Sequence, residues 1–184
     1  MNGIEIMVEE HKYISRMLKV VRSACYKILN GSSVDYEDFT KVIEFIRNYA
    51  DNHHHGKEEK FLFNRMVDEI GEVADKLINF GMLIEHDLGR LYIKNLEEAL
   101  KRVKNGDDES RLDVIANAIG YTQLLTGHIE KEDNTIYTFA NRQLSEKTLE
   151  IINRECSDYE KSTSEKNIQN KYIAILEDLE KKYI

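Results

Sequence analysis

The chain has 184 residues, enough for one domain with a substantial core and short for two. It contains no proline, only 9 glycines and 33% charged residues, which suits long uninterrupted helices and argues against a β-sandwich with frequent turns. The formal net charge of −8 argues against nucleic acid as a partner, because binding to phosphates needs a basic face.

The sequence indicates neither a membrane nor a secretory route. It lacks the run of about 18 apolar residues that a membrane-spanning helix needs, so we expect no membrane partner. Its first residues lack the basic and apolar regions of a secretory signal. The two cysteines, Cys25 and Cys156, lie far apart and form no CxxC motif. We therefore expect a cytoplasmic protein without a structural disulfide.

The first predicted helix covers residues 4–29 and ends at Asn30-Gly31, a typical stop signal. Its apolar positions recur at spacings of four and three, and His11 is the one imidazole among them. The second predicted helix covers 35–70, after a cap at Ser33. A run of three histidines lies in its middle.

The register of the second helix around these histidines is left open by periodicity. The apolar stripe before them places His53 on the core side, whereas the apolar residues after them continue the phase of His55 and Glu59. A spacing of four residues, one helical turn, also places His54 over Glu58. The glycine after the histidine run can absorb a change of phase, because glycine is the least constrained residue.

The third predicted helix covers 73–105 and ends at Asn105-Gly106. Its apolar seam is interrupted only by His86 and, a turn later, by Gly89. A glycine at this position either makes room for something beside the helix or allows close helix packing. Both explanations are compatible with the sequence.

The fourth predicted helix covers 110–140 and places both His128 and Glu132 on its core side. Burying an unpaired carboxylate costs several kcal/mol. Glu132 therefore needs a partner, and a cation is the obvious one; a buried histidine–glutamate pair is the alternative.

Two shorter helices without histidine are predicted over residues 145–159 and 164–182, joined by a Ser/Thr-containing link at 162–164. Short connections make consecutive helices antiparallel neighbours. We therefore predict an all-α fold, an up-down-up-down four-helix bundle over 1–143, with a C-terminal helical extension, 144–184, packed on it.

In such a bundle His11, His55, His86 and His128 fall at comparable levels along the helices, given the rise of about 1.5 Å per residue. Unrelated core histidines have no reason to share one level, whereas a metal site requires it. The sequence therefore predicts a metal centre inside the bundle.

Three stretches carry a family resemblance: residues 52–63 (NHHHGKEEKFLF), 85–90 (EHDLGR) and 128–133 (HIEKED). Their order and spacing are similar to those of the hemerythrin-like (HHE cation-binding) domain family, over roughly residues 1–143. The resemblance implies a non-haem di-iron centre with bridging carboxylates, and manganese or zinc as substitutes. The implied metal ligands are His11, His55, Glu59, His86, His128 and Glu132.

The resemblance further implies that His11 and His55 bind one iron and that His86 and His128 bind the other, with Glu59 and Glu132 bridging. His54, Glu58 and Asp133 are the alternatives to these ligands. Oxygen-carrying hemerythrins have a second histidine four residues after the position of His86, where this chain has Arg90. The resemblance thus predicts one metal short of a ligand, which argues against reversible O₂ carriage.

The function implied is that of a di-iron protein that binds, senses or handles O₂, NO, peroxide or iron. The alternative is a di-iron redox enzyme, for peroxide or NO reduction, ferroxidase chemistry or iron delivery to clusters, with an electron-transfer partner. A third possibility is an interaction protein whose metal is purely structural. Consumption of peroxide or NO by the iron-loaded protein distinguishes the enzyme from the other two.

Overall fold

A computed structural model describes residues 1–184. It is helical throughout and has no strand, so the predicted all-α fold is confirmed. None of its helices combines the length and the apolar character that crossing a membrane requires.

The first two helical segments match their predicted ranges closely. The first is α1 (Gly3–Leu29); the second comprises α2 (Tyr36–Phe45), π-helical stretches at Ile46–His55 and Glu58–Phe63, and α3 (Asn64–Ile70). The cap of α2 is Asp35 rather than the predicted Ser33, because the Asp35 carboxylate accepts the backbone N–H of Asp38 at 3.1 Å.

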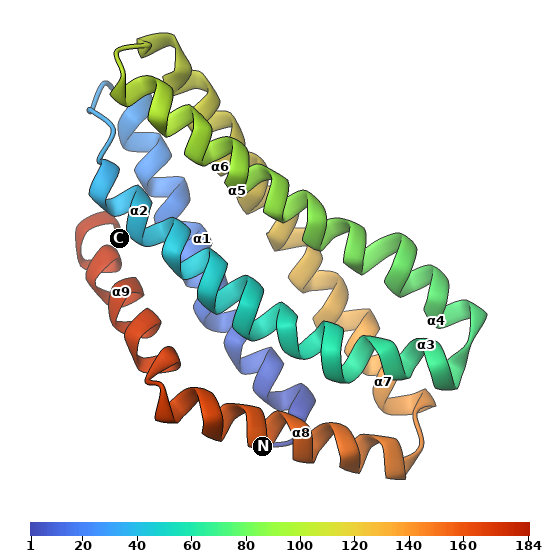
Figure 1. Ribbon diagram of the computed structural model, residues 1–184. Coiled ribbons are helices and arrows are strands. Elements are labelled where there is room, and N and C mark those ends of the chain that lie inside the picture. The colour runs from blue at the N-terminus through green and yellow to red at the C-terminus, as the bar shows by residue number, and fades with distance from the viewer.

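The next two segments also agree with prediction to within a few residues. One comprises α4 (Glu72–Leu77), a π-helical stretch at Ile78–Met82, and α5 (Leu83–Lys104). The other comprises a 3₁₀ turn at Asp108–Ser110, α6 (Arg111–Lys131), a π-helical stretch at Glu132–Ile136, and α7 (Tyr137–Gln143). Figure 1 shows these segments passing back and forth along the long axis of the molecule, each antiparallel to the one before.

The C-terminal helices are α8 (Glu146–Glu165) and α9 (Ile168–Tyr183), both in contact with α1. Ser145 caps α8, since its hydroxyl accepts the N–H of Thr148 at 3.3 Å. The predicted break at 162–164 is wrong. Thr163 stays helical with its hydroxyl donating to the carbonyl of Tyr159 at 3.0 Å, and the chain turns instead at Asn167, which has a φ of 55°.

The apolar core falls into two clusters separated by a polar layer. One cluster of 28 residues packs mainly α1, α2, α5, α6 and α9; the other, of 14, packs the start of α1 against α3, α4, α7 and α8. Along the helical segments of the bundle, the histidines lie between residues of the two clusters. His11, for example, lies between Met7 of the smaller cluster and Ile14 of the larger one. The fold thus surrounds one buried polar layer with apolar side chains on both sides.

Candidate metal centre

Seven side chains in this layer gather into two groups of potential metal ligands. One group contains His55, Glu58, His86 and His128, and the other contains His11, His54, Glu58 and Glu132; within each, the donor atoms lie within 4.8 Å of one another. All seven residues are at most 5% exposed. Glu58 is common to both groups, so the groups are adjacent.

The π-helical stretch at Ile46–His55 explains how consecutive histidines enter one interior. In an α-helix, adjacent side chains point about 100° apart, as follows from 3.6 residues per turn. The wider turn of a π-helix reduces this angle, and such turns are frequent at functional sites. His54 and His55 are both buried, and each joins a different group.

The carboxylates of Glu58 and Glu132 face both groups. Oε2 of Glu132 lies 3.3 Å from Nε2 of His11, and its Oε1 lies 3.1 Å from Nε2 of His128. Oε2 of Glu58 lies 3.6 Å from Nε2 of His86. These two carboxylates are therefore placed to be shared by two cations.

A second ring of carboxylates surrounds the imidazoles and faces their other nitrogen, Nδ1. The distances from Nδ1 are 2.8 Å for His11 to Asp133, 2.9 Å for His54 to Glu10, 2.8 Å for His86 to Glu59, 2.8 Å for His128 to Glu85, and 3.5 Å for His55 to Asp51. In the four pairs at 2.8–2.9 Å the carboxylate holds the ring proton on Nδ1 and leaves the lone pair of Nε2 on the opposite side of the ring; Nδ1 of His55 makes no hydrogen bond. In the four histidines paired in this way, that opposite side faces the shared interior.

Several of the inward-facing atoms have no hydrogen-bond partner. They are Nε2 of His11, Nε2 of His54, Oε2 of Glu58 and both carboxylate oxygens of Glu132. In addition, Nε2 of His86 and Nε2 of His128 lie only 3.1 Å apart. Buried polar atoms are almost always paired, and each unpaired one needs an explanation. Cations between these atoms would satisfy them, so the residues fit a metal site.

The pKa shifts in the layer also indicate that its buried carboxylates require positive charge nearby. Burial, together with the neighbouring charge of Glu132, raises the pKa of Glu58 to about 8. Burial opposes charge on His128 as well, but the carboxylates of Glu132 and Glu85 outweigh it and raise the pKa of His128 to about 10. Without a cation, the charge of the two carboxylates is therefore balanced by protons.

The arrangement differs from the predicted one in two respects. Glu59 belongs to neither group: it is partly exposed, and its Oε1 accepts from Nδ1 of His86 at 2.8 Å. Glu58, one of the alternatives, takes the interior position. In addition, His54 rather than His55 accompanies His11. Both differences arise because the π-turns shift the helical phase relative to the 3.6-residue period.

The prediction drawn from Arg90, that one metal is short of a ligand, depends on how many imidazoles each group contains. His55 joins His86 and His128, so this group contains three imidazoles although Arg90 stands one turn beyond His86. The group with His11 contains only two. Arg90 lies outside both groups and donates to Asp51 and to Glu59, each at 2.7 Å. The group with fewer imidazoles is therefore the one that contains His11, and His86 does not belong to it.

A buried lysine to which the sequence assigned no role lies beside His53, with its Nζ 3.2 Å from Nε2 of that ring. Lys57 is 0% exposed, and its ammonium donates to the carboxylates of Glu10 and Glu160. Glu10 in turn accepts from Nδ1 of His54 at 2.9 Å, and Nε2 of His53 lies 2.9 Å from its other oxygen. Through Glu160, helix α8 is thereby connected to the histidine layer.

Comparison with known families agrees with this geometry. The family described as the hemerythrin HHE cation binding domain matches residues 2–140, which include all the histidines as well as Glu58 and Glu132. No curated protein and no solved structure matches the chain significantly. Helices α8 and α9 lie outside the matched range. Because the match spans most of the sequence, the chain belongs to the hemerythrin HHE cation-binding domain family.

Proposed function

We propose that the polar layer holds two metal ions, natively iron, shared by Glu58 and Glu132. One ion would be held by the three imidazoles of the first group and the other by His11 and His54. The unpaired inward-facing nitrogen and oxygen atoms are the observation that carries this proposal. Imidazole and carboxylate donors suit iron, with manganese or zinc as substitutes, and no thiolate is present in either group.

We further propose that the protein binds, senses or handles O₂, NO or peroxide. When bound, paired iron ions supply redox chemistry and a Lewis-acidic site for such molecules. The chain's own part is to hold the imidazoles by their Nδ1 carboxylates and to exclude bulk water with the two apolar clusters. The Tyr137 hydroxyl donates to Oε1 of Glu58 and so fixes that carboxylate. The side with two imidazoles has fewer protein donors, which favours it for an exogenous ligand.

The direct test is metal analysis of anaerobically purified protein, followed by a visible spectrum after exposure to air. We expect about two iron ions per chain, as the two ligand groups require, and the absorption of an oxo-bridged diferric pair. Protein that takes up less than one equivalent of any divalent metal would contradict the proposal. Sustained consumption of peroxide or NO with a reductant would favour the redox enzyme over a binding or sensing role.

Removal of the metal should lower the melting temperature of the protein. The ligands come from α1, α5, α6 and the π-helical stretches, so an ion that binds only the folded state stabilises all of them by mass action. A free metal concentration of about 100 times Kd adds about 2.7 kcal/mol to the free energy of unfolding, which raises the melting temperature by roughly 5–10 °C for a chain of this size. Superimposable melting curves with and without a chelator would show that the site is incidental to stability.

Metal loading should also release protons, and the apparent affinity should increase with pH. Carboxylate partners raise the pKa of His11 and of His86 to about 9 against the effect of burial, so both carry protons at neutral pH that a metal must displace. The metal affinity is therefore weaker below these pKa values and rises with pH toward about 9. Each proton displaced changes the binding constant about tenfold per pH unit. Proton release in unbuffered titrations measures the number of protons displaced per metal ion, and a pH-independent affinity between pH 6 and 8 would contradict this prediction.

A further inference from the structure

The outer face of the third helical segment, from Glu72 to Lys104, carries a row of exposed apolar side chains. Phe80 is 71% exposed, Ile84 46%, Leu88 42% and Leu91 50%. We call these four residues the apolar stripe. Each stands two positions after a buried residue of the same segment; these buried residues are Ile78, Met82, His86 and Gly89. Residues two positions apart on a helix point in nearly opposite directions, so the stripe faces away from the core.

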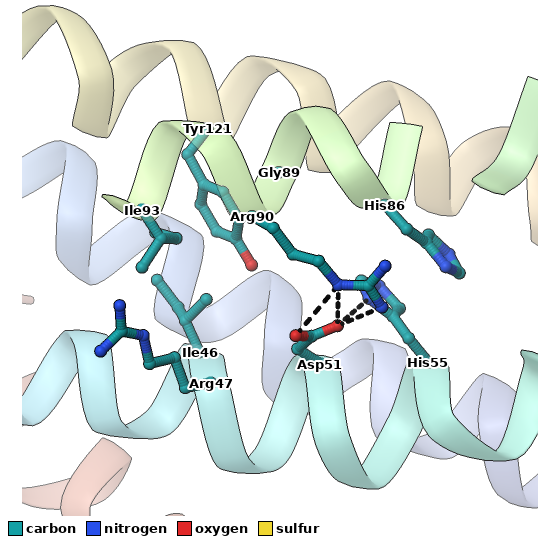
Figure 2. A pocket seen from close by; sticks show the side chains of 9 residues that line it. All are labelled: Ile46, Arg47, Asp51, His55, His86, Gly89, Arg90, Ile93 and Tyr121. Atoms are coloured by element: carbon teal, nitrogen blue, oxygen red, sulfur yellow. Dashed lines mark hydrogen bonds and ion pairs between the residues drawn. The ribbon is translucent and has the colours of Figure 1, made fainter. Parts of the chain in front are cut away.

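Neither the rest of the chain nor the neighbouring charged side chains cover the apolar stripe. Helices α8 and α9 pack on α1 and α2, and Figure 1 shows them on the opposite side of the molecule from α4 and α5. The guanidinium of Arg90 turns toward Asp51 on the second helical segment (Figure 2), and Asp87 accepts from Arg90 at 2.9 Å. Of the ten large apolar residues exposed in the chain, the stripe contributes four. Such a contiguous apolar patch is typical of an interaction site.

The apolar stripe can pair with the same stripe of a second copy of the chain. When two such helices pack antiparallel about a two-fold axis, Ile84 of each copy lies opposite Leu88 of the other. In the same register Phe80 lies opposite Leu91, because the two pairs have nearly the same mean position in the sequence. Each of the four side chains then exchanges water for an apolar neighbour. One register therefore gives every residue of the stripe a partner.

The charges at the two ends of the segment favour the antiparallel orientation. Helix α4 has a net charge of −1, from Glu72, Asp75 and Lys76. The part of α5 after Leu91 has a net charge of +2, from the residues Lys94, Glu97, Glu98, Lys101, Arg102 and Lys104. Ion-pair partners of these residues on other elements lower this value to +1 but leave it positive; they are Arg47, Asp107 and Asp113. An antiparallel contact places the acidic end of each copy beside the basic end of the other, whereas a parallel contact places like charges together.

We propose that the apolar stripe is the interface of a symmetric homodimer in which the third helical segments of two copies pack antiparallel. Two-fold homodimers are the commonest soluble oligomers, and their interface uses the same patch of both copies. Each copy carries a formal net charge of −8, but at physiological salt the repulsion between exposed charges is screened beyond about 8 Å. Contacts at the stripe therefore decide the association. The dimer does not require metal, since the stripe points away from the layer that contains His86.

Sedimentation of the full, metal-loaded chain at physiological salt tests the dimer. We expect the parent chain to sediment as a dimer. Leu88→Glu should weaken the dimer at least about 30-fold, the effect of losing a central interface residue, because it brings a carboxylate into an apolar contact. Leu112→Glu, at a leucine of α6 that is 68% exposed and outside the stripe, is the matched control and should leave the dimer unchanged. Both leucines are exposed, so the circular dichroism of both variants should equal that of the parent.

Two results of this experiment would overturn the proposal. One is a parent chain that stays monomeric at roughly 100 μM, above the micromolar Kd values of the weakest interfaces of standard size; the stripe would then be left to a different protein. The other is equal association of Leu88→Glu and Leu112→Glu, since the dimer would then use another face.

Cysteine variants test the antiparallel orientation. The native cysteines, Cys25 and Cys156, are both buried, so new thiols on the stripe react without interference from them. A mixture of Phe80→Cys and Leu91→Cys chains should form disulfide-linked dimers on mild oxidation, and neither variant should do so alone. Linked dimers from Phe80→Cys alone would mean a parallel contact, and a mixture without linked dimers would contradict the register.

Discussion

Replacing Glu58 by glutamine is expected to remove at least one metal ion per chain, whereas Glu59→Gln should keep the full complement. Glu58 is 0% exposed and belongs to both ligand groups. Its neutral amide analogue cannot serve as a shared anionic ligand. Glu59 instead accepts from Nδ1 of His86 and from Arg90, so its loss alters the support of one imidazole and no inward-facing donor. Loss of such an outer carboxylate typically weakens metal binding by 10- to 100-fold, which loading with excess metal overcomes.

Iron content by elemental analysis, together with circular dichroism of each variant, checks this pair. The two residues are adjacent and of the same type, so Glu59→Gln is a matched control for any general effect of a substitution in this helix. Full stoichiometry in Glu58→Gln with loss in Glu59→Gln would mean that the second helix has the phase in which His55 and Glu59 face inward together.

Replacing Lys57 by methionine is expected to destabilise the protein by about 3 kcal/mol, as typically follows removal of one partner of a buried ion pair. The Lys57 ammonium is the cation between Glu10 and Glu160. Burial disfavours the charge of Glu10, but hydrogen bonds from His53 and His54 and the charge of Lys57 hold its pKa well below the ordinary value. Without Lys57, a carboxylate that is 5% exposed loses its counter-charge. Thermal melts of the metal-loaded protein should show a decrease of roughly 6–12 °C.

Lys60→Met is the control, because Lys60 is exposed and only three residues away. The double variant Lys57→Met with Glu160→Gln should recover part of the loss, since it removes one of the two uncompensated carboxylates. A single variant as stable as Lys60→Met, or a double variant less stable than the single one, would show that the ammonium is not the source of the stability.

The ends of the helices could be predicted because their signals are local. Gly31, Gly71 and Gly106 have φ values of 91°, 80° and 99°, conformations that glycine adopts without strain and other residues avoid. Each of the three lies at the end of a helical segment, where the sequence places a stop. The break before α9 was misplaced because the turn residue there is Asn167, and a Ser/Thr stretch four residues earlier gave the stronger signal.

The register around the histidines could not be predicted from periodicity, since that method assumes 3.6 residues per turn throughout. The π-helical stretches at Ile46–His55 and Glu58–Phe63 violate the assumption where the ligands lie. The spacing of four between His54 and Glu58 was visible in the sequence, but the apolar residues downstream favoured the phase of Glu59. The Glu10–Lys57–Glu160 cluster left no local signal, because its members are brought together only by tertiary packing.

The contact between α8 and the histidine layer makes the C-terminal helices part of the energetics of metal binding. Displacing α8 from α1 would withdraw Glu160 from Lys57 and disturb Glu10, which holds Nδ1 of His54. By reciprocity of linked equilibria, an ion bound at His54 must oppose that displacement by the same free energy. The docking of α8 on α1 would then depend on whether metal is bound at His54. A partner protein that binds α8 in its displaced position would lower the affinity for one of the two ions.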